Sequence, residues 1–84
     1  MTTYIKVIFE EKWKQAELPY LTHRNIPTKA SSKRMPASIE RARKWAETHE
    51  VKESDGKLFT RILKRIELDD GFSKTVMWER KEQA

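Results

Sequence analysis

The sequence predicts a small α+β domain, in which a three- or four-stranded antiparallel sheet carries one helix on one face. Three observations support this fold class. An alternating apolar run opens the chain, an amphipathic segment follows a proline near its middle, and two β-prone runs flank an Asp-Asp-Gly turn near its end. Because each amphipathic element needs cover for its apolar face, all of them are expected to share one core. The predicted order is strand, optional short strand, helix, strand, strand.

The first element is a strand over residues 3–13. Ile5, Val7, Phe9 and Trp13 share one parity, while Lys6, Glu10 and Lys12 share the other, which also holds Tyr4 and Ile8. Such a period of two is typical of a half-buried strand. Their β-branched and aromatic side chains favour the same structure.

The pattern of residues 14–37 is weak. Residues 18–21 contain Pro19 and predict at most a short edge strand, because proline is confined to sheet edges. Residues 22–36 hold two prolines, two adjacent serines and five basic residues, counting His23. We therefore expect a long basic loop there, of the length that is usually functional or disordered.

A helix is expected from Pro36 to about residue 50. Proline suits the first helical turn, where a missing N–H costs nothing. The spacing of Ile39, Ala42 and Ala46 places them on one face, which the sheet should cover. His49 would end this stripe, near the negative end of the helix dipole.

Residues 57–81 predict a β-hairpin around the Asp-Asp-Gly turn, and its register decides which side chains face the core. A two-residue turn would scatter charges onto both faces. A three-residue turn, with Gly71 left-handed, pairs Leu68 with Phe72 and Ile62 with Trp78. We predict this second register because it separates apolar from polar residues.

Length and composition predict a single domain over residues 1–84. The chain has no cysteine, a formal net charge of +5 and a pI of about 9.6. A basic balance of this kind favours nucleic acids or acidic protein surfaces as partners. The chain also lacks any apolar run of membrane-spanning length and any signal-peptide pattern, so we expect a soluble, cytoplasmic protein with no membrane partner. Residues 81–84 are expected to fray.

No residue pattern predicts catalysis, a metal site or a cofactor. His23 and His49 have no acidic neighbour at metal-ligand spacing. Asp69 and Asp70 are explained by turn chemistry, because aspartate caps local backbone donors. We expect a binding protein rather than an enzyme, with no cofactor. Turnover that depends on either histidine would overturn this expectation.

Two surfaces are candidates for partner binding. The first is a basic patch, formed if the loop folds back beside the helix; it comprises Arg24, Lys29, Lys33, Arg34, Arg41, Arg43 and Lys44. The second is the outer face of the hairpin, where basic, aromatic and methionine side chains mix as in binding interfaces. In the predicted register this face comprises Phe59, Arg61, Leu63, Arg65 and Met77.

The layout of residues 3–13 and 36–80 resembles small phage and mobile-element modulators, including some single-domain anti-CRISPR inhibitors. The resemblance is carried by the strand, the helix sequence from Ala37 to Ala46, and the hairpin that ends in Trp78. It implies a non-enzymatic inhibitor of a larger host protein or nucleoprotein complex, such as a CRISPR effector, acting in the host cytoplasm. The alternative is a direct DNA- or RNA-binding module that uses the basic loop and helix. The sequence leaves both open, as it does the choice between monomer and homodimer.

Overall fold

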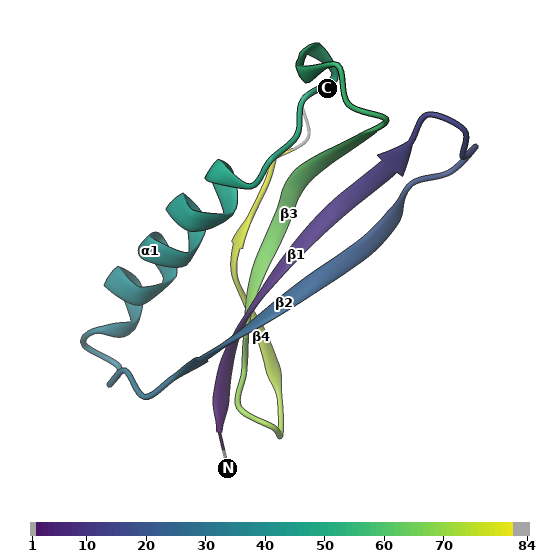
Figure 1. The fold of residues 1–84 in the computed structure, drawn as a ribbon. Coiled ribbons are helices and arrows are strands. Elements are labelled where there is room, and N and C mark those ends of the chain that lie inside the picture. Colours follow the sequence, from purple (N-terminus) through teal and green to yellow (C-terminus); the bar gives the residue numbers. More distant parts are fainter. Residues whose placement is uncertain (1, 82–84) are drawn as a thin grey trace.

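The structure, a computed structural model, describes residues 2–81 as a four-stranded antiparallel sheet with one α-helix (Figure 1). The elements are β1 (Thr3–Trp13), β2 (Tyr20–Thr28), α1 (Met35–Thr48), a 3-10 turn η1 (Glu53–Asp55), β3 (Phe59–Asp69) and β4 (Lys74–Glu79). The strands lie in the order β2-β1-β3-β4. The predicted α+β class is confirmed, with the chain order β-β-α-β-β. The predicted fraying beyond residue 81 lies outside the described residues.

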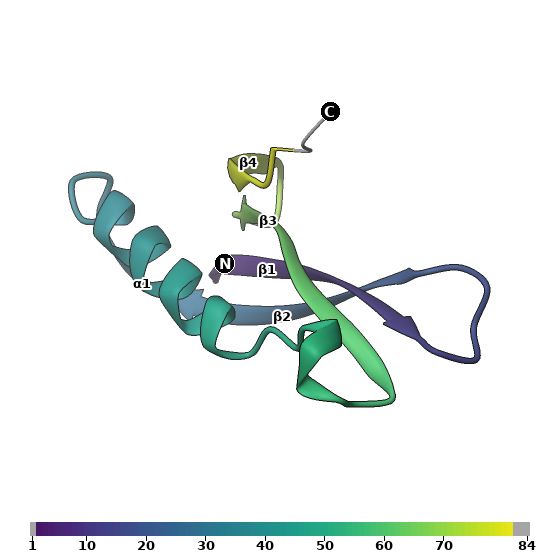
Figure 2. The same ribbon diagram turned by 90° about the horizontal axis from the view of Figure 1, so that it is seen from above.

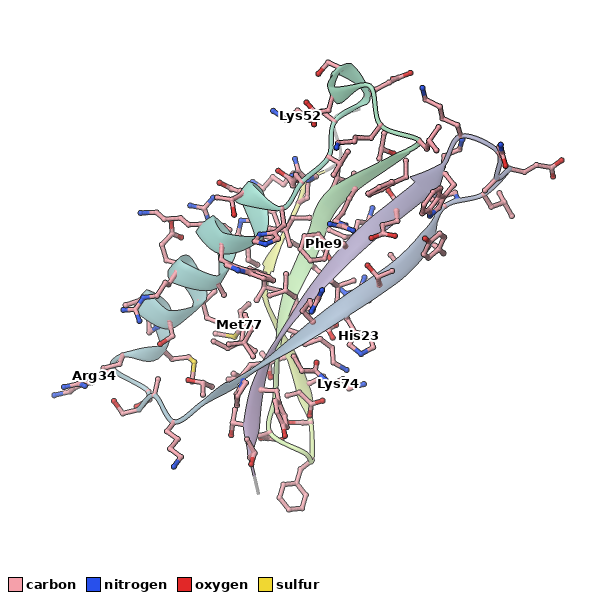
Figure 3. All side chains as sticks on the ribbon, viewed as in Figure 1. Phe9, His23, Arg34, Lys52, Lys74 and Met77 are labelled. Atoms are coloured by element: carbon pink, nitrogen blue, oxygen red, sulfur yellow. The ribbon has the colours of Figure 1, made fainter. Side chains whose placement is uncertain are left out.

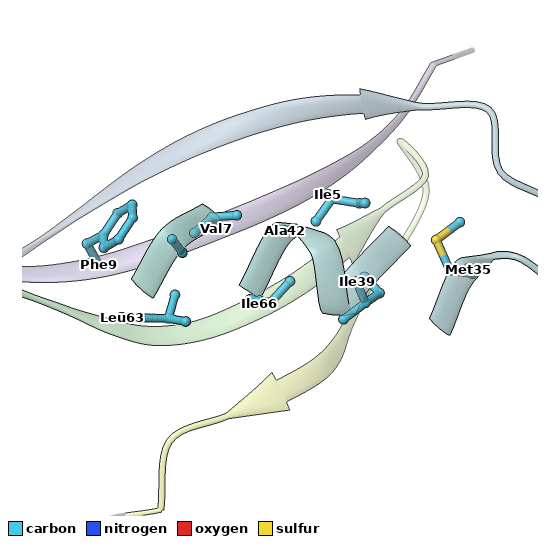
Figure 4. Close-up of a cluster of buried hydrophobic side chains, with 9 residues drawn as sticks. Ile5, Val7, Phe9, Met35, Ile39, Ala42, Leu63 and Ile66 are labelled. Carbon is cyan, nitrogen blue, oxygen red and sulfur yellow. The ribbon is translucent and has the colours of Figure 1, made fainter. Parts of the chain in front are cut away.

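Helix α1 runs along one face of the twisted sheet, and no other α-helix occurs within residues 2–81 (Figure 2). The core lies between this helix and the two central strands (Figure 4). It is formed by Ile5, Val7 and Phe9 of β1, Leu63 and Ile66 of β3, and Met35, Ile39, Ala42 and Ala46 of α1. The predicted inward faces of the first strand and of the helix are thus confirmed, although His49 is exposed. No helix in this part of the chain has the length and apolar character that crossing a membrane requires.

The predicted loop over residues 22–36 is wrong, because residues 22–28 belong to β2 and residues 35–36 begin α1. This strand pairs with β1 along its length, from Thr28 opposite Thr3 to Tyr20 opposite Glu11. As an edge strand it needs few apolar side chains and tolerates Pro27, so its sequence lacks the usual strand pattern. The remaining connection to α1 is short and spans residues 29–34.

The predicted hairpin register is also wrong. Ile66 lies opposite Trp78, and Leu68 lies opposite Thr75. The turn is wider than predicted because the Asp70 carboxylate accepts the backbone N–H groups of Phe72 and Ser73, each at 2.8 Å. These hydrogen bonds lower the pKa of Asp70. Gly71 does adopt the expected left-handed conformation, with φ 91°.

A β-bulge in β3 explains why the face assignment of this strand failed. The pairing with β1 shifts between Ile8, opposite Arg65, and Phe9, opposite Leu63. The extra residue, Lys64, reverses the alternation, so that Leu63 and Ile66 both face the core with no exposed surface. Phe59, Arg61 and Leu63, which precede the bulge, therefore lie on the helix-facing side, opposite to the prediction.

Candidate functional site

A groove lies between α1 and the edge strand β2. Helix α1 contacts β1 and β3, so β2 stands apart from it and forms the opposite wall. The middle of the groove encloses about 510 Å³. Its lining is mainly apolar and includes Ile5, Ile26, Pro27, Ala42 and Trp45.

Polar regions extend this groove at both ends. Toward the start of α1 it widens over Lys29, Arg34 and Arg41. Toward the end of α1 it narrows into a space of about 180 Å³ beside Arg24 and His49. Arg41 is shared by the middle and the first end, and Trp45 by the middle and the second. We call this continuous surface the α1–β2 groove.

Trp45 is the largest side chain in the wall of the α1–β2 groove. It is 37% exposed, and its ring lies 4.3 Å from that of His49, centroid to centroid. His49 Nδ1 lies 2.9 Å from the Trp45 carbonyl oxygen, and Thr48 Oγ1 donates to the same oxygen at 2.6 Å. Because a carbonyl only accepts hydrogen bonds, a hydrogen bond between these two atoms requires Nδ1 to be the donor. These contacts hold the last turn of α1, so Trp45 is presented on a fixed backbone.

The net charge of the chain is concentrated on β2, α1 and the connection between them. From the start of β2 to the end of α1, residues 20–48, there are seven Lys or Arg and two Glu. The rest of the chain carries eleven charges of each sign. Residues 20–48 therefore account for the whole formal charge of +5.

Within this segment the two glutamates bind a single arginine. Arg43 donates to Glu47 Oε1 at 2.5 Å and also binds Glu40. Its hydrogen bonds lower the pKa of Glu40, and the carboxylates raise the pKa of Arg43. The charge of Arg43, which the sequence analysis placed in the basic patch, is consequently neutralised by these two carboxylates.

The remaining Lys and Arg side chains of residues 20–48 form no ion pair with a carboxylate among residues 2–81. Four of them line the groove, namely Arg24, Lys29, Arg34 and Arg41. On β3 and beyond it, the arginines are paired instead: Arg61 with Glu11, Arg65 with Glu67, and Arg80 with Glu50. Unpaired arginine is thus a property of the groove rather than of the protein surface at large.

The charges of α1 oppose its dipole. Arg34 stands at the N-cap, with no side-chain capping hydrogen bond, and the first turn holds no acidic residue (Figure 3). Anions, not cations, are favoured at this end of a helix. The arginine and the dipole therefore add to a positive field at one end of the groove.

The structure brings together part of the predicted basic patch. Arg24, Lys29, Arg34 and Arg41 line the groove, although Arg24 stands on the edge strand β2 and not on the predicted long loop. Lys33 and Lys44 are exposed but do not line it.

The predicted outer face of the hairpin is not assembled. Leu63 is fully buried, and Phe59 stacks on Trp13 at 4.9 Å on the helix-facing side. Arg61 lies on that side as well, opposite Glu11. Met77, labelled in Figure 3, is 40% exposed and lines a hollow together with Met35 and Leu68. Only Arg65 remains on the outer face, and it is paired.

The sequence did not single out Trp45, Ile26 and Pro27 as site residues. The one available signal was Trp45 itself, which stands beside the apolar stripe of the helix rather than within it. Among residues 2–81, no three His, Asp or Glu side chains form a group suited to a metal ion.

No protein-family model, curated protein or solved structure matches this chain. The resemblance to phage modulators stays a prediction.

Proposed function

We propose that this protein binds nucleic acid, with the phosphate backbone lying along the α1–β2 groove. One observation carries the proposal: β2, α1 and the connection between them account for the entire net charge, and four cations lining the groove have no carboxylate partner among residues 2–81. Phosphate groups spaced along a strand match such a row of cations, and their contacts release condensed counterions. Arginine suits this role because its planar guanidinium donates two parallel hydrogen bonds to a phosphate.

Stability alone gives no reason for this arrangement. Like charges in one groove repel, and a cation at a helix N-terminus is unfavourable by a few tenths of a kcal/mol or more. The same chain neutralises its arginines with carboxylates elsewhere, at Glu11, Glu50 and Glu67. Leaving Arg34 and Arg41 unpaired is therefore consistent with an external anionic ligand.

Charge reversal at Arg41 tests the proposal. Fluorescence anisotropy with labelled single-stranded and duplex oligonucleotides, over a series of KCl concentrations, gives the affinity and its salt dependence. We expect log K to fall linearly with log salt, and Arg41→Glu to weaken binding and reduce that slope by about one. Lys12→Glu is the matched control, because it makes the same charge change at an exposed position of β1 that pairs with Thr60 on the outer face.

Equal losses for Arg41→Glu and Lys12→Glu would contradict a site in the groove, since only the net charge would then matter. Absence of binding to either oligonucleotide would overturn the proposal altogether. An acidic protein surface, as the sequence-based inhibitor hypothesis requires, would then be the remaining ligand for these cations.

A further inference from the structure

We infer that the nucleic acid in the α1–β2 groove is single-stranded, and that one of its bases stacks against Trp45. This inference rests on the proposed function and names the class of strand that the groove accepts. It comes from the order of chemical groups along the groove, which is cationic, then apolar and aromatic, then cationic again.

The middle of the groove is unsuited to phosphate alone. Ile26, Pro27 and Ala42 offer apolar surface, and Trp45 offers an indole that is 37% exposed. A ligand that covers this surface needs flat, weakly polar groups. Nucleobases are such groups, and their stacking on aromatic side chains tolerates any base sequence.

Cations stand on both sides of this apolar stretch. Arg41 precedes Trp45 by one helical turn and faces the same groove. Arg24, on the opposite wall, lines the narrow end beside Trp45. A strand that places one base at Trp45 therefore has phosphates before and after it within reach of an arginine.

A duplex does not fit this order. Its bases are paired and stacked on one another, so it presents phosphates and base edges but no free base face. A duplex contacted by the exposed side of α1 would use Arg34, Arg41 and Lys44, and would leave Trp45 and Ile26 unused. The apolar lining thus distinguishes the two classes of ligand.

Two probes of equal charge isolate the stacking contribution. The first is an oligothymidylate, and the second is an abasic strand of the same length, which keeps the phosphates and lacks every base. We expect the wild-type protein to bind the oligothymidylate more tightly by roughly tenfold, the effect of about one stacked base. Trp45→Leu should remove most of that difference, because it should weaken binding of the oligothymidylate far more than binding of the abasic strand or of a duplex.

Circular dichroism checks that the variant is folded. Quenching of tryptophan fluorescence provides a second readout that does not depend on measured affinities. Oligothymidylate should quench the tryptophan fluorescence of the wild-type protein, and Trp45→Phe, which retains Trp13 and Trp78, should abolish most of that quenching. Equal affinity of the wild-type protein for the two probes, or tighter binding of the duplex than of the oligothymidylate, would overturn the inference while the proposed function stands. If neither probe nor the duplex binds, the proposed function itself is wrong.

Discussion

Arg61 and Glu11 form an ion pair across β1 and β3, with Arg61 Nε donating to Glu11 Oε1 at 2.7 Å. Glu11 is 8% exposed, and it is the one buried charged residue within residues 2–81. Its other carboxylate oxygen accepts the hydroxyl of Tyr20 at 2.8 Å, and Tyr20 in turn accepts the indole N–H of Trp13 at 2.6 Å. One carboxylate therefore connects β1, β2 and β3 at the narrow end of the groove.

Replacing Glu11 with alanine should destabilise the protein by about 2 kcal/mol, because it removes two hydrogen bonds and leaves Arg61 unpaired. The effect should stay below the roughly 3–5 kcal/mol of a fully buried pair, since the Arg61 side chain is 29% exposed. Urea denaturation gives the free energy of unfolding. Glu11→Gln, which keeps the shape and part of the hydrogen bonding, should lose less; equal losses would show that the charge of Glu11 accounts for the whole effect.

Tyr20 should titrate above the ordinary tyrosine pKa of 10.0, because its hydrogen bond to Glu11 raises the pKa. A group whose pKa is raised on folding stabilises the protein below its unfolded pKa, and this contribution is lost as pH rises through the folded value. We therefore expect stability to fall above pH 10.0, and less steeply in Tyr20→Phe. Ultraviolet titration of the phenol in the wild type and in Glu11→Gln checks the cause, because the variant should titrate closer to 10.0. An unchanged titration in Glu11→Gln would contradict it.

The observed register predicts opposite outcomes at two apolar residues of the hairpin. Leu63→Ala should destabilise by about 2–5 kcal/mol, because the side chain is fully buried. Phe72→Ala should change stability by less than about 0.5 kcal/mol, because the ring is 87% exposed at the turn. Thermal and urea unfolding of both variants measure this contrast. A mild Leu63→Ala together with a severe Phe72→Ala would restore the register that the sequence favoured.

Arg34→Asp should separate stability from binding. An anion at the start of α1 interacts favourably with the helix dipole, so the free energy of unfolding should rise by about 0.3–1 kcal/mol. The same change removes a cation from the groove and should weaken nucleic-acid binding. Both quantities are measured on one purified variant, by urea denaturation and by fluorescence anisotropy. If stability and affinity rise together, Arg34 does not belong to the site.

Much of this fold could be predicted from local pattern alone. Ile5, Val7 and Phe9 recur with a period of two, although Ile8 on the other face is also apolar and buried, and Ile39, Ala42 and Ala46 recur at helical spacing. In both elements one face is buried along its length, so burial leaves a regular period in the sequence.

The rest depends on pairing between distant segments, which leaves little local trace. Strand β2 is stabilised by backbone hydrogen bonds to β1, and these place few demands on side chains at a sheet edge. The bulge at Lys64 reverses the faces of β3 without any Gly or Pro to mark it. Because the face assignments of Phe59, Arg61 and Leu63 depended on that parity, all three were misplaced.

The candidate site was predictable only as a collection of charges. Arg24, Lys29, Arg34 and Arg41 could be grouped from their density along the chain. The apolar middle of the groove required knowing that β2 lies beside α1, since Ile26 and Trp45 are far apart in sequence.

Chemical-shift mapping in solution tests the groove as the binding site most directly. Oligothymidylate is added to the ¹⁵N-labelled protein, and backbone amide and indole N–H signals are followed by NMR. We expect the largest shifts along β2 and α1, including Ile26, Arg41 and the indole of Trp45, with small changes at Lys12 and Lys74 on the outer face and at the indole of Trp78. Shifts concentrated on the outer face, or saturable binding that leaves the indole of Trp45 unmoved, would contradict the site.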